Sequence, residues 1–74
     1  MQIYKNLGGN SNIRAYSIGE DFIDVQFNGG ALYRYSYLSA GREKVEQMKR
    51  LAIQGVGLNS FLAYRIIKEF KPTP

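Results

Sequence analysis

Apolar and polar residues alternate along two stretches in the first half of the chain. In Phe22–Phe27 the residues at 23, 25 and 27 are apolar, and Asp24 and Gln26 stand between them. Successive side chains of a strand point to opposite faces, so this stretch predicts a strand with one apolar and one wet face. Residues 12–18 alternate in a similar way. They predict a strand with positions 13 and 15 on one face and positions 14, 16 and 18 on the other.

A turn and a further strand follow directly. The segment Asn28-Gly29-Gly30 contains steps that suit a positive φ, which a tight hairpin requires. The turn is therefore expected to need both glycines. After it, Tyr33, Tyr35 and Tyr37 occupy every second position, which places three phenol rings on one strand face.

The length of the loop decides where the tyrosines point. A three-residue loop pairs Val25 with Tyr33 and adds the tyrosines to the apolar face. A two-residue loop pairs Val25 with Leu32 and leaves the tyrosines beside Asp24 and Gln26. The three-residue loop is favoured because it gathers the apolar residues of both strands on one face. The sequence alone leaves both registers open.

The second half of the chain predicts two helices. Ser39 is the expected N-cap of a helix over about Ala40–Gln54, with an apolar stripe at positions 45, 48 and 52. Gly55 is expected to end this helix as its C-cap. Asn59 is the expected cap of a second helix that reaches about residue 69 or 70. The residues expected on its apolar stripe are Leu62, Ala63, Ile66, Ile67 and Phe70, and those on its opposite side are Phe61, Tyr64, Arg65 and Lys68.

These elements predict an α+β fold. It consists of an antiparallel three- to four-stranded sheet followed by two helices packed on one face, in the order β-β-β-α-α. Ile3-Tyr4 is a candidate for an additional edge strand. A chain of 74 residues makes one domain. Its packed core is expected over about residues 11–70, with a flexible run at 5–11 and a tail at 71–74.

Cysteine and histidine are both absent from the chain. Their absence excludes disulfides and the usual zinc sites, and it leaves none of the common nucleophile–base pairs. We therefore expect no metal, no cofactor and no enzymatic activity. No apolar run approaches the roughly 20 residues that cross a bilayer, and Met1–Asn6 has no apolar signal-peptide core. The expected location is the cytoplasm, with no membrane partner.

The net charge is concentrated in the helical half. Up to residue 40, three basic residues balance three acidic ones, whereas from residue 41 onward seven basic residues stand against three acidic ones. The formal charge of +4 therefore belongs to the helical half, which points to an anionic partner. The residues expected to bind nucleic acid are Arg34, Tyr37, Arg42, Lys49, Arg50, Tyr64, Arg65 and Lys68.

These features also have a purely structural interpretation. Tyrosines on a sheet can stack on bases, but Tyr33 and Tyr35 are expected to fill the core of so small a domain. Tyr37, at the end of its strand, is expected to be accessible. The basic residues can follow phosphates, or they can pair with Glu46 and Glu69 at i,i+4 spacing on a solvated helix face.

Four segments in order carry a resemblance to a known family. They are Ser11-Asn12-Ile13, Phe27-Asn28-Gly29-Gly30, Tyr33-Arg34-Tyr35 and Gly55-Val56-Gly57-Leu58-Asn59. Together they resemble the KTSC domain, a small domain found at the C-terminus of some lysyl-tRNA synthetases and as free-standing bacterial and phage proteins. The resemblance covers about Ser11 to Phe70. The chain departs from the family at Leu58, where an aromatic residue is common, and it lacks the proline usual at the start of the first helix. The resemblance implies a sheet packed on two helices and suggests RNA binding.

The predicted function is that of a small, non-catalytic binding module. Nucleic acid, and RNA first, is the expected partner, bound through the basic helices and an exposed aromatic side chain. The alternative is a protein-interaction module of a bacterial or phage accessory protein, which binds through an edge strand or the Phe61/Tyr64 surface. An unpaired basic strip favours the first function, and an uncharged apolar patch favours the second.

Overall fold

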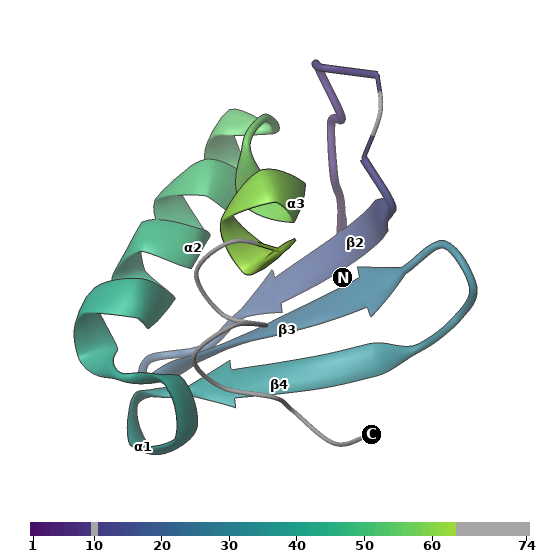
Figure 1. Cartoon of the computed structure of the whole chain (residues 1–74). Coiled ribbons are helices and arrows are strands. Elements are labelled where there is room, and N and C mark those ends of the chain that lie inside the picture. The colour runs from purple at the N-terminus through teal and green to yellow at the C-terminus, as the bar shows by residue number, and fades with distance from the viewer. Residues whose placement is uncertain (10, 64–74) are drawn as a thin grey trace.

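The computed structural model describes residues 1–9 and 11–63. In this part of the chain, a four-stranded antiparallel sheet of order β1-β2-β3-β4 is followed by helices (Figure 1). The elements are β1 (Gln2–Ile3), β2 (Ile13–Ile18), β3 (Phe22–Phe27), β4 (Leu32–Ser36), α1 (Tyr37–Ala40), α2 (Arg42–Gln54) and α3 (Leu58–Phe61). The predicted α+β fold class is confirmed.

The β3–β4 hairpin has the three-residue loop. The Phe27 N–H donates to the Ala31 carbonyl oxygen at 2.8 Å, and Val25 lies opposite Tyr33. This register places the tyrosines of β4 on the apolar face, as the favoured alternative predicts. Gly30 has a φ of +96°, which strains any residue with a Cβ. Gly29 does not have a positive φ, so the prediction that the turn needs both glycines is wrong for Gly29.

A β-bulge changes the faces of β2. Ile13 lies opposite Phe27, but Ala15 lies opposite Gln26, so β2 has one more residue than β3 at this point. After the bulge, Tyr16 lies opposite Val25 and packs against the core, whereas Ala15 lies opposite Gln26 on the other face, although it too is only 3% exposed. The predicted pairing of positions 13 and 15 on one face is therefore wrong.

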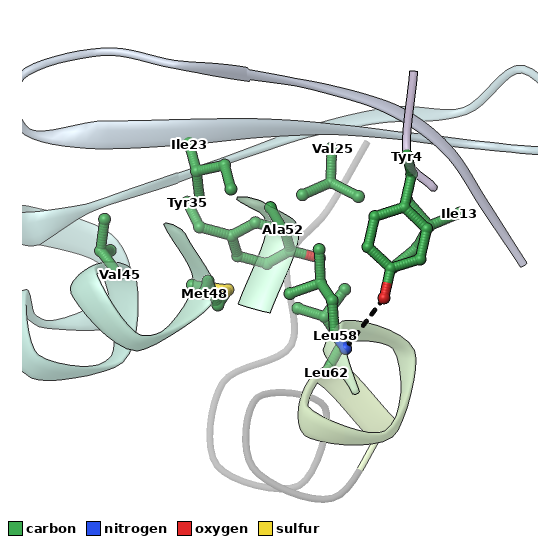
Figure 2. Packing of buried hydrophobic residues seen from close by; sticks show 10 residues of the cluster. All are labelled: Tyr4, Ile13, Ile23, Val25, Tyr35, Val45, Met48, Ala52, Leu58 and Leu62. Carbon is green, nitrogen blue, oxygen red and sulfur yellow. Dashed lines mark hydrogen bonds between the residues drawn. The ribbon is translucent and has the colours of Figure 1, made fainter. Parts of the chain in front are cut away.

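The core lies between α2 and the face of the sheet that carries Ile23, Val25 and Tyr35, which we call the inner face (Figure 2). Ile23 and Val25 are 0% exposed, and Tyr35 is 2% exposed. From α2, the predicted stripe at positions 45, 48 and 52 provides Val45, Met48 and Ala52, all of which are buried. Apolar residues at i, i+3 and i+7 share one side of a helix, which explains why this side faces the sheet.

The N-terminal segment also belongs to the core. Tyr4 is 4% exposed, and its hydroxyl oxygen accepts a hydrogen bond from the Leu58 N–H at 3.3 Å (Figure 2). The Leu7 N–H donates to the Gly55 carbonyl oxygen at 2.8 Å. These contacts join the start of the chain to the turn after α2. The packed core therefore includes Tyr4, whereas the sequence predicts a core that begins near residue 11.

The start of α2 differs from the prediction. Ser36 is the N-cap of α1, where it forms a capping box with Ser39, so Ser39 does not cap the long helix. The chain then turns at Gly41, which has a φ of +93°, and α2 follows. Gly55 ends α2 at the predicted position, with a φ of +82° and its N–H bonded to the Leu51 carbonyl oxygen at 2.9 Å.

The last described helix also begins differently. Its N-cap is Gly57, in the left-handed conformation, and Asn59 lies inside α3, so the predicted capping role of Asn59 is wrong. Leu62 is buried as predicted, but Ala63 is exposed, and Phe61 packs against the core although the opposite was expected. The rest of the predicted helix lies outside the described residues.

Candidate functional site

The basic residues of α2 lie beside Tyr37, the first residue of α1. The guanidinium carbon of Arg42 is 5.7 Å from the centre of the Tyr37 ring, and the ammonium nitrogen of Lys49 is 5.5 Å from it. Arg42 and Lys49 are two helical turns apart, so both reach the same aromatic ring. The two residues therefore share one flank of the helix.

Glu46 completes this cluster. Its Oε2 accepts a hydrogen bond from the Tyr37 hydroxyl and lies 2.8 Å from Nζ of Lys49. Nζ of Lys49 also donates to the carbonyl oxygen of Glu20 at 2.9 Å, and the Lys49 side chain is only 12% exposed. Lys49 is thus held by two acceptors within the protein, and little of its ammonium group is open to a phosphate. Glu46 pairs at i,i+3, where the sequence predicts i,i+4 partners.

The pKa values of the cluster shift in matching directions. The hydrogen bonds from Lys49 and Tyr37 lower the pKa of the Glu46 carboxyl group. The hydrogen bond to Glu46 raises the pKa of both Lys49 and Tyr37. At neutral pH the cluster therefore holds a carboxylate, an ammonium group and a neutral phenol. Tyr37 is half-buried and its hydroxyl is engaged by Glu46, so it is less accessible than the sequence predicts.

Arg34 lies on the outer face of the sheet, opposite the helices. Its Nε and Nη2 donate to the two carboxylate oxygens of Asp24 at 2.7 Å and 3.0 Å. Its guanidinium carbon lies 3.9 Å from the centre of the Phe22 ring. The hydrogen bond to Asp24 is the main cause that raises the pKa of Arg34. Arg34 is thus engaged by a carboxylate and an aromatic ring of β3.

Arg42 and Arg50 remain exposed on α2. They line one surface hollow together with Glu43, Glu46 and Gln47, and Arg50 donates to the Gln47 side-chain oxygen. Two acidic residues therefore stand beside the two guanidinium groups. This flank of α2 is mixed in charge and is not the unpaired basic strip that phosphate binding favours.

The tyrosines of β4 lie on the inner face, where Tyr33 is half-buried and Tyr35 is buried. Tyr35 is buried, and Tyr33 packs edge-on between Phe27 and Tyr35 at ring-centre distances of 5.5 Å and 6.4 Å. These rings contribute area to the core and do not form an open stacking platform. The other residues predicted to bind nucleic acid, Tyr64, Arg65 and Lys68, lie outside the described residues.

β4 is an edge strand, and within the described chain its one strand neighbour is β3. Hydrogen bonds at the two ends of the hairpin fix the orientation of its backbone. The Phe27 N–H donates to the Ala31 carbonyl oxygen at 2.8 Å, and the Tyr37 N–H donates to the Asp21 carbonyl oxygen at 2.9 Å. Bonded and non-bonded pairs alternate in an antiparallel ladder. Positions 31, 33 and 35 therefore bond to β3 and position 37 to the residue just before it, whereas positions 32, 34 and 36 direct their backbone groups away from β3.

Two of these three residues are open. The Ser36 N–H is bonded to Ser39 Oγ at 3.0 Å through the capping box. The backbone groups of Leu32 and Arg34 point outward, and their side chains are also accessible, with Leu32 53% exposed. An edge strand was one of the surfaces that the sequence predicted, but not these residues. The length of the hairpin loop could have identified these residues. A three-residue loop makes the backbone N–H and C=O groups of the even-numbered residues of β4 point away from β3.

The opposite edge of the sheet is short and irregular. β1 contributes two residues, which pair with Tyr16 and Ala15, and β2 carries its bulge at Arg14. Short strands and bulges hinder the addition of another strand. β4 pairs with β3 over five residues without a register shift. The β4 edge is therefore the one suited to strand addition.

The described part of the chain holds no group of three or more Asp, Glu, His or Cys side chains that could bind a metal ion. None of the helices within residues 1–9 and 11–63 is long and apolar enough to cross a membrane. A hollow of about 220 Å³ beside the N-terminal loop is lined by Tyr4, Asn6, Gly8, Ser11, Val56, Gly57, Asn59 and Ser60.

No family model, curated protein or solved structure matches this chain.

Proposed function

We propose that this chain is a non-catalytic protein-interaction module that binds an extended segment of its partner along β4. The observation that carries the proposal is the open edge, where the outward N–H and C=O groups of Leu32 and Arg34 have no partner among the described residues. Such groups accept an additional strand, because main-chain hydrogen bonds then supply affinity and neighbouring side chains supply selectivity.

The side chains around this edge favour a peptide over a polyanion. Arg34 is already paired with Asp24, so the edge offers a phosphate no free cation. Leu32 is 53% exposed and provides an apolar contact beside the main-chain groups. A partner segment that presents an apolar side chain toward Leu32 and unbonded backbone groups toward β4 satisfies both features.

Nucleic-acid binding, and RNA first, is the second candidate. It is favoured by the net charge of +4 and by the exposed guanidinium groups of Arg42 and Arg50 on one flank of α2. The resemblance to the KTSC domain and the cytoplasmic location also remain proposals. The order of sheet before helices supports the resemblance.

Selection from a random heptapeptide display library tests the first proposal. A matched pair of variants, Leu32→Pro and Leu32→Ala, separates main-chain from side-chain binding. Proline removes the outward N–H but no hydrogen bond to β3, because Leu32 and Gln26 form a non-bonded pair. We expect Leu32→Pro to weaken peptide binding by up to about tenfold, because it removes one main-chain hydrogen bond. Leu32→Ala should weaken it less.

The mapping of the bound surface decides between the two candidates. Peptides bound at β4 should shift the amide resonances of Leu32–Ser36. A single-stranded RNA of mixed sequence, titrated at two salt concentrations, provides the other arm. If the RNA binds in a salt-sensitive manner that Arg42→Gln and Arg50→Gln abolish, and the selected peptides leave β4 unaffected, the second candidate replaces the first.

A further inference from the structure

The open edge of β4 is complementary to a second copy of itself. We propose that the chain self-associates through β4. Two copies pair antiparallel about a two-fold axis at Tyr33, and their two four-stranded sheets join into one continuous sheet. This inference rests on the proposed function, because it names the added strand as β4 of another copy.

The backbone register selects Tyr33 as the axis. About this axis, Leu32 of one copy faces Arg34 of the second copy, and the outward N–H of each meets the outward C=O of the other. All outward N–H and C=O groups of these two residues are then bonded. An axis at Leu32 would instead bring Arg34 opposite Gly30, whose N–H already donates to the Phe27 carbonyl oxygen at 2.9 Å.

The capping box of α1 disfavours the other neighbouring register. An axis at Arg34 would bring Leu32 opposite Ser36 of the second copy, whose N–H already donates to Ser39 Oγ at 3.0 Å. With the axis at Tyr33, Leu32 lies against the aliphatic part of Arg34 of the second copy. The guanidinium group of Arg34 keeps its two hydrogen bonds to Asp24. On the inner face, the half-buried Tyr33 rings of the two copies approach each other across the axis.

Natural sheets guard their free edges with charged side chains, bulges or very short strands. Arg34 is the charged residue of β4, and it does not guard this edge. Its guanidinium group forms an ion pair with Asp24 on β3, and its guanidinium carbon lies 3.9 Å from the centre of the Phe22 ring. The side chain is therefore drawn back over β3. The edge presents main-chain groups to a partner without an unpaired charge.

The difference between the two edges limits the assembly to two copies. A two-fold contact between β4 strands uses the same edge of both copies. The remaining edges are formed by the two-residue β1 and the bulged β2, which are poorly suited to further pairing. We therefore expect a closed dimer and not a fibre.

Sedimentation equilibrium of the full chain from about 10 µM to about 1 mM covers the affinity expected of such a small interface. We expect a monomer–dimer equilibrium. Amide hydrogen exchange at Leu32 and Arg34 should slow as the concentration rises. The amides of Tyr33 and Tyr35 already bond to β3 and should change little. A chain that stays monomeric over this range overturns the proposal.

A matched pair of lysine variants tests the site. Leu32→Lys places an ammonium group opposite Arg34 of the second copy, and it should lower the association constant at least about tenfold. Ile53→Lys on α2 changes the net charge equally at a position of similar exposure, 58% against 53% for Leu32, and should leave association unchanged. Equal effects of the two variants would show that β4 is not the interface.

Cysteine crosslinking tests the register, since the chain has no cysteine of its own. In the proposed dimer, residues 32 and 34 of different copies are directly opposite, with Cα atoms about 5.5 Å apart, which a disulfide can span. A mixture of Leu32→Cys and Arg34→Cys chains should therefore crosslink faster than either variant alone. Equal rates would overturn the axis at Tyr33.

A synthetic peptide of residues 31–37 separates this inference from the proposed function. If the peptide protects the Leu32 and Arg34 amides of a chain that itself remains monomeric, self-association falls and strand addition at β4 stands. If the chain is monomeric and the peptide leaves both amides unprotected, self-association falls, and the heptapeptides selected from the library decide whether strand addition at β4 stands. A dimer that the peptide dissociates supports both.

Discussion

Ile23 and Asp24 are neighbours in β3, yet they stand in opposite environments. Ile23 faces α2 with 0% of its surface exposed, and Tyr35 lies directly opposite it on β4. Asp24 faces outward and pairs with Arg34, whose side chain is 61% exposed. The inner face is held by close packing, and the outer face is held by an ion pair between a side chain that is 61% exposed and one that is 16% exposed. The inner face of this hairpin therefore supplies packing that stabilises the fold, and the outer face carries the side chains that solvent can reach.

Truncation of neighbouring residues tests this comparison most directly. We expect Ile23→Ala to lower the free energy of unfolding by about 2–5 kcal/mol, because it removes buried methyl groups and leaves a cavity. Asp24→Ala should cost much less, because ion pairs at the surface are screened by water. Urea denaturation of both variants measures the difference. Similar losses for the two variants would show that the outer face contributes as much as the core.

Substitutions in the β3–β4 turn, whose length fixes which side chains lie on each face, provide the next test. Gly30 has a φ of +96°, and a Cβ there would meet no atom within 4 Å, so backbone strain is the main cost of a side chain. Gly30→Val should lower stability by about 1–3 kcal/mol. Gly29→Val should stay within about 0.5 kcal/mol, since Gly29 is exposed and its φ is not positive. Thermal denaturation checks both variants, and an equal loss in the pair would contradict the observed turn.

The pH dependence of stability provides the last test of the inner face. Burial is the main cause that raises the pKa of Tyr35 from 10.0 to about 12. Because the folded state favours the neutral phenol, this contribution is complete below pH 10.0 and is lost as the pH rises to about 12. Melting temperatures measured across this range should fall for the wild type and fall less for Tyr35→Phe. An unchanged alkaline sensitivity in the variant would show that Tyr35 is not responsible.

Local patterns predicted a large part of the fold. The alternation in residues 22–27 matches β3, the stripe at 45, 48 and 52 matches the buried side of α2, and Gly55 ends that helix. These features depend on the preferences of neighbouring residues and on helix or strand periodicity, which a single sequence carries. The sequence favoured the observed hairpin register without fixing it, because the three-residue loop gathers the apolar residues of both strands on one face.

The helix starts were harder to predict. Ser36, Ser39 and Asn59 all have side chains suited to an N-cap, but only Ser36 is in place, because the chain turns at Gly41 and Gly57 before the next two helices. A capping residue acts where the backbone leaves the helical conformation, and several candidates within a few residues compete for that position. Local sequence does not rank them.

The candidate site was predicted least well. The sequence shows where the cationic residues are but not their partners, since the network of Tyr37, Glu46 and Lys49 joins two helices and requires the turn between them. Similarly, Arg34 was predicted to bind nucleic acid, whereas it is engaged by Asp24 on the adjacent strand. Charge can be counted along a chain, but the charge that is free to bind a ligand depends on which side chains meet in space.

The sequence by itself determined the α+β class, the sheet face that packs on α2, and the absence of thiol and imidazole chemistry. Only the tertiary structure decided that Tyr4 completes the core beside Leu58, that a bulge shifts the faces of β2, and that β4 is left as the open edge. The physical reason is the range of the interactions. Periodicity and turns depend on residues a few positions apart, whereas the order of strands and the contact between Tyr4 and Leu58 depend on segments far apart in the chain.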